Sequence, residues 1–171
     1  TYNSSKHQSY VDGQTDIAEA LVGGNWKTVL LSSTGGGGQG VFALDVSNPA
    51  AFDKTKVMWE FTDRDDADLG NVMGTPKVVK LQTNAKFTAG VANTPEYEWF
   101  AVVPSGVNNF VADVNVSTSK KPHLFLLKLS KTAGTAWALG ANYFKFEIPT
   151  VDALSATVSP GAINFQATTG L

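Results

Sequence analysis

The chain contains no cysteine and only two histidines, His7 and His123, which lie far apart in the sequence. Without cysteine it forms no disulfide, no zinc–thiolate site and no thiol nucleophile. Neither histidine has a further ligand or an acidic partner beside it in sequence, so no histidine metal site or serine triad is predicted. The 13 basic and 15 acidic residues form no long run of one sign. The broad basic surface that nucleic-acid binding requires is therefore not expected.

Long hydrophobic runs are also missing, because no apolar stretch approaches the roughly 18 to 20 residues that span a bilayer. The sequence has neither an initiator methionine nor a signal peptide, so we expect it to be part of a longer protein. Its apolar content of 43% over 171 residues is sufficient for one domain with a hydrophobic core.

Short apolar segments separated by glycine, proline and polar turns predict an all-β chain. We expect strands at residues 16–21, 26–32, 40–46, 56–62, 75–81, 98–103, 123–129 and 143–148, and a ninth beginning near Ala162. Long helical periodicity is absent. A single helical turn is expected at residues 47–52, with proline near its start.

The eight strands form two sets of four with matching features in the same order. Trp26 corresponds to Trp99, Thr15 to Thr75, and residues 42–44 to residues 125–127. This repeat predicts antiparallel four-stranded blades of a modified, incomplete β-propeller. Residues 1–9 are expected to be a polar leader or linker. Residues 10–171 should hold about two blades and the start of a third, with insertions near residues 82–95 and 108–122.

An array of two blades leaves apolar faces bare at both ends. We therefore expect that the chain either associates with itself through these faces or belongs to a larger propeller.

Gly35, Gly37 and Gly40 have the spacing of a dinucleotide-binding loop. Such a loop needs a helix after the glycines, so that the helix N-terminus faces the pyrophosphate. The residues that follow, 41–46, favour a strand. The glycines are therefore predicted to form a hairpin turn.

Four carboxylates, Asp63, Asp65, Asp66 and Asp68, follow the fourth predicted strand. Calcium takes several such oxygens, which makes this segment a candidate metal loop. However, Ala67 stands where a D-x-D-x-D-G loop has its third ligand. Asx turns and strand-end caps explain the run more simply, so no metal ligand is assigned.

Of the four tryptophans, Trp26, Trp59 and Trp99 fall within predicted strands, and core packing between blades is the expected role. Trp137 lies between glycines and is less constrained. Exposure and a role in sugar binding therefore remain open for Trp137.

Taken together, the ordered segments of residues 10–81 resemble the C-terminal domain of the PilC/PilY family of type IV pilus proteins. The segments are residues 10–13, 23–30, 35–38, 40–49, 59–61 and 68–70; their most distinctive members are Trp26, Gly35, Gly37, Gly40, Phe42, Leu44, Asp45, Trp59, Asp68 and Gly70. Beyond about residue 82 the resemblance fades.

The resemblance implies a propeller at the C-terminal end of a large exported protein, located outside a Gram-negative cell or on its outer membrane. It implies a non-enzymatic module that promotes pilus biogenesis and surface adhesion, with pilin subunits or host-cell surface molecules as partners. Many members carry a calcium loop in a later blade. No such loop is present here, so calcium is expected only in the full-length protein.

Two alternatives remain open: a quinoprotein-like propeller enzyme, disfavoured by the lack of cysteine and of an evident ligand group, and an extracellular carbohydrate-binding module.

Overall fold

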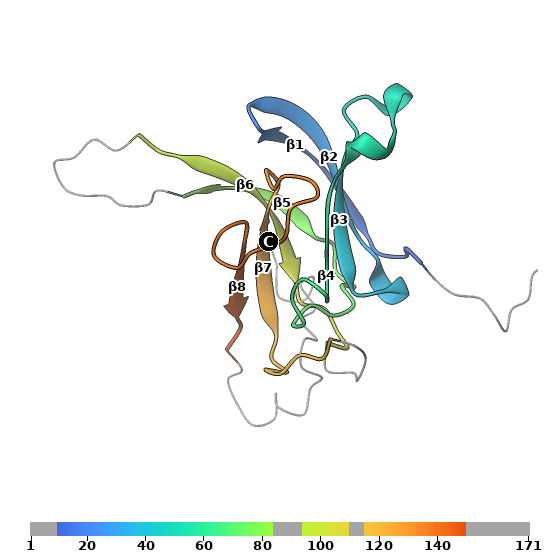
Figure 1. Ribbon diagram of the computed structural model, residues 1–171, viewed down its shortest axis with the longest axis vertical. Helices are drawn as coiled ribbons and strands as arrows, with labels where there is room; N and C mark the ends of the chain where they lie inside the picture. Colours follow the sequence, from blue (N-terminus) through green and yellow to red (C-terminus); the bar gives the residue numbers. More distant parts are fainter. Residues whose placement is uncertain (1–9, 84–93, 110–114, 150–171) are drawn as a thin grey trace, which may run out of the picture.

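Two four-stranded antiparallel sheets form the body of the molecule in the computed structural model (Figure 1). The structure describes residues 10–83, 94–109 and 115–149, and its regular elements there are strands and short 3₁₀ turns. The first sheet has the order β1 (Thr15–Val22), β2 (Asn25–Ser33), β3 (Gly40–Asp45) and β4 (Val57–Thr62). The second has the order β5 (Lys77–Gln82), β6 (Tyr97–Pro104), β7 (His123–Lys128) and β8 (Tyr143–Glu147).

The all-β class and the four-stranded antiparallel unit are confirmed, because each sheet is a meander of four consecutive strands. All eight predicted strands are present, with ends shifted by one or two residues. β1 begins at Thr15, whereas β5 begins at Lys77, two residues beyond Thr75. The helical turn expected at residues 47–52 is the 3₁₀ turn η3 (Pro49–Ala51).

The predicted leader, much of both insertions and the ninth strand lie outside the described residues. The two sheets are not closed into a ring, as expected of an incomplete propeller.

The hydrophobic core lies between the two sheets, because alternate residues of each strand point toward the other sheet. Phe61 of the first sheet is central: its ring centroid lies 5.5 Å from that of Phe125 and 5.2 Å from that of Tyr143 in the second. Burying each large side chain contributes about 1.5–3 kcal/mol. The buried members of this core include Val29, Leu31, Val41, Trp59, Phe61, Val103, Phe125 and Leu127.

Main-chain hydrogen bonds also join the two sheets, in the loops that follow β4 and β6. The amide of Gly70 donates to the carbonyl of Ser105 at 2.6 Å, and Asn71 and Val107 exchange two bonds of 2.6 and 2.9 Å. A side chain at Gly70 would overlap the carbonyl oxygen of Val107. Glycine is therefore required there for the two backbones to approach.

The outward faces of both sheets carry exposed apolar side chains. Ile17, Leu21 and Val57 are exposed on the first sheet, and Leu81 and Phe146 on the second. These bare faces are those expected of a short array of blades.

The four tryptophans occupy different environments. Trp59 is buried in the core, and Trp99 is partly buried against it. The core role predicted for Trp26 is wrong: it is 65% exposed, because along β2 it falls out of phase with Val29 and Leu31, whose side chains face the core. Trp26 meets Trp99 edge to face, with ring centroids 6.1 Å apart.

Trp137, for which exposure remained open, packs into the interface instead. Its ring lies edge-on to Trp59 and Phe61, at centroid distances of 5.3 and 5.1 Å. The loop between β7 and β8 thus completes the core that the strands begin.

Candidate functional site

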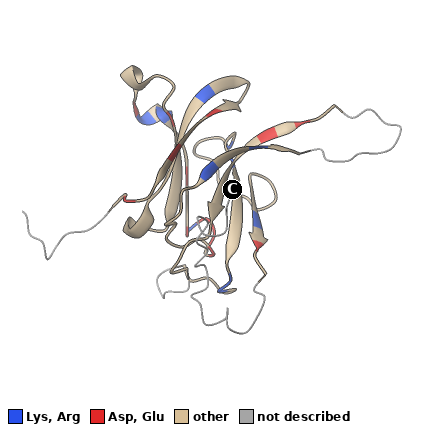
Figure 2. Cartoon of the chain, turned by 180° about the vertical axis from the view of Figure 1, so that it is seen from behind, with Lys and Arg blue, Asp and Glu red and all other residues tan. Residues whose placement is uncertain are grey.

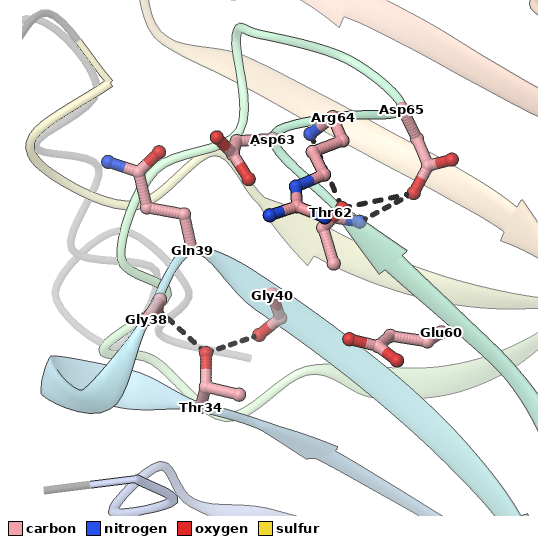
Figure 3. A pocket seen from close by; sticks show the side chains of 9 residues that line it. All are labelled: Thr34, Gly38, Gln39, Gly40, Glu60, Thr62, Asp63, Arg64 and Asp65. Atoms are coloured by element: carbon pink, nitrogen blue, oxygen red, sulfur yellow. Dashed lines mark hydrogen bonds between the residues drawn. The ribbon is translucent and has the colours of Figure 1, made fainter. Parts of the chain in front are cut away.

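A cavity opens at one end of the first sheet, where the β2–β3 loop faces the loop after β4 (Figure 3). We call it the β3–β4 pocket. Its volume of about 600 Å³ is in the range of ligand-binding clefts. It is lined by Thr34, Gly38, Gln39, Gly40, Glu60, Thr62, Asp63, Arg64 and Asp65. Because no aromatic or aliphatic residue is among them, the lining suits a polar ligand.

One wall of the pocket is the glycine turn, held together by Thr34. The amide of Thr34 donates to the carbonyl of Gly40 at 2.9 Å, and its hydroxyl lies 2.7 Å from the carbonyl oxygen of Gly38. The 3₁₀ turn η2 (Gly35–Gly37) leads to β3 within a few residues. The hairpin prediction is confirmed, and the helix that a dinucleotide site requires is replaced by a strand.

The glycines of this turn are required by close backbone approach. Gly35 has a φ of +58°, and a side chain there would overlap Asp12. A side chain at Gly37 would overlap the backbone of Tyr10. Asp12 in turn accepts a hydrogen bond of 2.6 Å from the amide of Gly36. The turn and residues 10–13 therefore form one structural joint.

The opposite wall is the chain that leaves β4. Asp65 accepts hydrogen bonds from the amide of Thr62 at 2.9 Å and from its hydroxyl at 3.3 Å (Figure 3). Asp63 accepts one of 3.0 Å from the side chain of Asn115. These contacts fix the backbone on which Arg64 stands.

Three polar groups that line the pocket have no hydrogen-bond or ion-pair partner among the described residues. The carboxylate of Glu60 and the guanidinium of Arg64 form no hydrogen bond or ion pair there, not even with each other. The side-chain oxygen of Gln39 is buried without a hydrogen-bond partner, while its amide nitrogen donates to the carbonyl of Asn108 at 3.2 Å. Glu60 and Arg64 are exposed, so solvent satisfies their charges, whereas the Gln39 oxygen is out of contact with solvent.

A second group of polar residues lies between the two sheets, and we call it the inter-sheet cluster. Lys145 of β8 donates hydrogen bonds of 2.9 Å to Asp66 and 2.7 Å to Asp68. The hydroxyl of Tyr143 donates to Asp66 at 2.9 Å. A loop of the first sheet is thus bound to the last strand of the second by charge-assisted hydrogen bonds.

These contacts shift the pKa values of the cluster. Burial alone raises the pKa of Asp68, but the hydrogen bonds from Lys145 and two serines outweigh it and hold that pKa below its usual value. Burial lowers the pKa of Lys145, but the hydrogen bonds to the two carboxylates raise that pKa by more, so the net shift is upward. Burial and the bond to Asp66 both raise the pKa of Tyr143. The charged forms of Asp68 and Lys145 stabilise each other.

Serine, histidine and aspartate meet in this cluster, although no partner for His123 was predicted from the sequence. The hydroxyl of Ser117 donates to Asp68 at 2.5 Å and that of Ser119 at 2.9 Å, while Nε2 of His123 lies 3.6 Å from the same carboxylate. In a catalytic triad the serine bonds to the histidine, which bonds to the acid. Here serine and histidine both face the acid, so the histidine does not activate the serine.

The carboxylates that made residues 63–68 a candidate calcium loop bind to other groups of the protein. Asp65 caps Thr62, Asp66 accepts a bond of 3.0 Å from the amide of Asp68, and Asp66 and Asp68 share Lys145. No group of three potential metal ligands gathers within residues 10–83, 94–109 and 115–149. The ammonium group of Lys145 stands where several carboxylate oxygens converge.

Three further residues of the family motif, Phe42, Leu44 and Asp45, lie in β3 and contribute to the first sheet. Asp45 pairs with Lys27 at 3.1 Å, and Phe42 and Leu44 are half-buried on the outward face of the first sheet. Glu60, Arg64, Tyr143 and Lys145 were not predicted from the sequence. No local pattern marks them, because their roles arise from residues distant in the sequence.

Charged residues of both signs are spread along the strands and loops of the two sheets (Figure 2). No helix among the described residues is long and apolar enough to cross a membrane.

Comparison with known proteins identifies relatives over most of the chain. Residues 1–136 match the family model of the PilY1 β-propeller domain. The likeness therefore extends well beyond residue 82, where it was expected to fade. A type IV pilus biogenesis factor PilY1 homolog of Xylella fastidiosa is 34% identical over 125 residues, which are 73% of this chain and 7% of that protein. PilY1 of Pseudomonas aeruginosa PAO1 is 41% identical over 92 residues, or 54% of this chain and 8% of the relative.

A solved structure gives the same result. The crystal structure of the Pseudomonas aeruginosa PilY1 C-terminal domain matches with a TM-score of 0.57 and 30% identity, over 84% of this chain and 23% of that one. The chain thus spans less than a tenth of the length of these curated relatives and about a quarter of the solved domain.

Proposed function

The chain belongs to the PilY1 β-propeller family, and from this we propose that it is a non-enzymatic binding and assembly segment of a type IV pilus biogenesis factor. Its proposed role is to promote pilus biogenesis and surface adhesion. The observation that carries the proposal is the family match over residues 1–136, joined to a two-sheet body that agrees with the solved PilY1 domain.

The architecture supports a role in presentation rather than in chemistry. Interleaved side chains, main-chain bonds and the inter-sheet cluster all hold the sheets together, which makes the body a rigid support. Connecting loops on such supports commonly carry binding function. The long β5–β6 and β6–β7 connections, together with the β3–β4 pocket, are therefore the proposed contact regions.

The proposed partners are pilin subunits or host-cell surface molecules, and the proposed location is the pilus-associated outer surface of a Gram-negative cell. The bare apolar faces of the two sheets are proposed to be covered by further blades of the longer protein, or by a second copy where those blades are missing. Any calcium requirement is assigned to the full-length protein.

We do not propose a sugar-binding role for Trp137: its ring is partly buried and packs edge to face with Trp59 and Phe61, which favours a role in the core.

Deleting residues 84–93 or residues 110–114, which lie within the two insertions and include none of the contact residues named above, within the full-length protein tests the proposal. Either deletion should reduce piliation or adhesion while leaving the protein folded and exported, as measured by limited proteolysis and surface immunoblotting. If pilus number and adhesion both stay at the unaltered level for both deletions, these loops are not the contact regions.

A further inference from the structure

Methionine carries all the sulfur of this chain, because cysteine is absent, and the sequence has only Met58 and Met73. The two thioethers lie in opposite environments. Met58 belongs to β4 and to the hydrophobic core and is 8% exposed, whereas Met73, in the loop between β4 and β5, is 54% exposed. Oxidation at sulfur is therefore confined to two side chains, and of these Met73 is the one that solvent reaches in the folded chain.

The main chain beside Met73 is held by contacts that do not use its side chain. Asn71 exchanges two main-chain hydrogen bonds with Val107, and the carbonyl of Val72 accepts one of 2.8 Å from the hydroxyl of Ser33. Val72 itself is fully buried. Because the fixed part of this loop ends at the backbone of Met73, a change in the polarity of that side chain leaves the packing intact.

Peroxide oxidises a thioether by transfer of one oxygen atom. The sulfur lone pair of Met73 attacks one oxygen of hydrogen peroxide, an S–O bond forms, the O–O bond breaks, and proton transfer to the departing oxygen gives water. Sulfur is oxidised to the sulfoxide and the peroxide is reduced. The new polar oxygen stays hydrated at an exposed position, whereas at Met58 it would be buried in apolar surroundings.

We infer that Met73 is a reversible oxidation site of this chain. Peroxide converts its side chain to the sulfoxide, the fold is retained, and a methionine sulfoxide reductase reaches the exposed product and reduces it. In that reduction a dithiol loses two electrons and becomes a disulfide, while the sulfoxide oxygen leaves as water. Met58 is protected by the core and reacts only when the structure opens locally. The site depends on exposure and not on the proposed pilus function.

The test treats the purified chain with excess hydrogen peroxide and follows each methionine by peptide mass spectrometry. Met73 should gain one oxygen at least about tenfold faster than Met58, because a buried group reacts only through opening. The chain oxidised at Met73 alone should keep its Tm to within about 2 °C, as expected of a change at an exposed residue. Adding dithiothreitol and the reductases for both sulfoxide epimers should then remove the oxygen.

Two variants assign the oxygen uptake to one residue. Met73→Leu, which roughly conserves volume, should abolish the rapid uptake, whereas the matched control Met58→Leu should leave it unchanged. In concentrated urea the two methionines of the unaltered chain should react at similar rates, which attributes the difference to the fold. If Met58→Leu fails to fold, the separate rates at Met58 and Met73 in the unaltered chain still decide.

Equal rates at the two methionines in the folded chain would overturn the assignment of Met73. A drop in Tm of more than about 5 °C after oxidation at Met73 alone would show that its side chain contributes to packing. If the reductases leave the sulfoxide in place, the site is not reversible. These readouts use the isolated chain, so they are distinguishable from the pilus function, which the loop deletions measure in cells.

Discussion

The indole nitrogen of Trp137 donates a hydrogen bond of 2.6 Å to the main-chain carbonyl of Glu60. Glu60 lies in β4, the edge strand of the first sheet, while Trp137 comes from the β7–β8 loop of the second. One blade therefore closes part of the open edge of its neighbour. An unpaired edge is a template for unwanted strand pairing, and this bond removes one of its free carbonyls.

Trp137→Ala should destabilise the chain by about 2–4 kcal/mol, because it removes two edge-to-face ring contacts and the bond to Glu60. Urea unfolding followed by circular dichroism measures the change. Trp137→Phe, which retains a ring, should cost less. Trp26→Ala is the matched control, since Trp26 is 65% exposed, and its cost should be clearly smaller. Equal losses at the two positions would contradict the interface role of Trp137.

Lys145→Met should cost about 2–4 kcal/mol, because it leaves Asp66 and Asp68 facing each other without a cation in a largely buried site. The control is Lys77→Met. Lys77 pairs with Asp16 at 2.9 Å, but its side chain is 55% exposed, so about 1 kcal/mol or less is expected. Thermal unfolding of both variants gives the comparison, and similar shifts in Tm would refute the distinction.

Stability should fall in acid partly through Asp68. Its pKa is lower in the folded chain than the ordinary value of 3.8, so its contribution is present above that value and lost as pH falls through the folded pKa. Asp68→Asn should lower stability at neutral pH and flatten the decline below about pH 4. Urea midpoints measured between pH 2 and 7 test this. An unchanged acid slope in the variant would assign the decline to other carboxylates.

Gly70→Ala should destabilise the chain by at least about 2 kcal/mol, because the added methyl group meets the carbonyl oxygen of Val107 and must displace one backbone from the other. Gly38→Ala is the matched control. Its nearest neighbour would be the hydroxyl oxygen of Thr34 at 3.5 Å, an ordinary contact, so its effect should be small. Thermal unfolding compares the two, and a mild Gly70 variant would show that the joint between the sheets yields easily.

Much of the fold could be predicted from local patterns. Alternating apolar residues located β4 and β8, and the glycine turn after β2 marked the β2–β3 hairpin, because strand periodicity and turn chemistry act over a few residues. The same local signals placed the strand ends within one or two positions.

The contacts between the two sheets could not be predicted from such local patterns. Asp68 and Lys145 meet although the sequence separates them widely, and neither residue type marks a partner in advance. Trp137 lacks strand periodicity, so its burial depends on a loop conformation that only the assembled sheets define. Trp26 was predicted to be a core residue from its place at the head of an apolar strand, but alternation along β2 puts it out of phase with the buried Val29 and Leu31.

The bonds between Gly70 and Ser105 and between Asn71 and Val107 use main-chain atoms alone. These bonds do not involve the side chain of Val107, whereas the side chains of Ser105 and Asn71 form further hydrogen bonds, to the amide of His123 and to the carbonyls of Gly35 and Gly38. Substitutions accumulated at Val107 over evolutionary time would therefore leave the spacing between neighbouring blades unchanged. Divergent surfaces can in this way be mounted on a framework of constant dimensions.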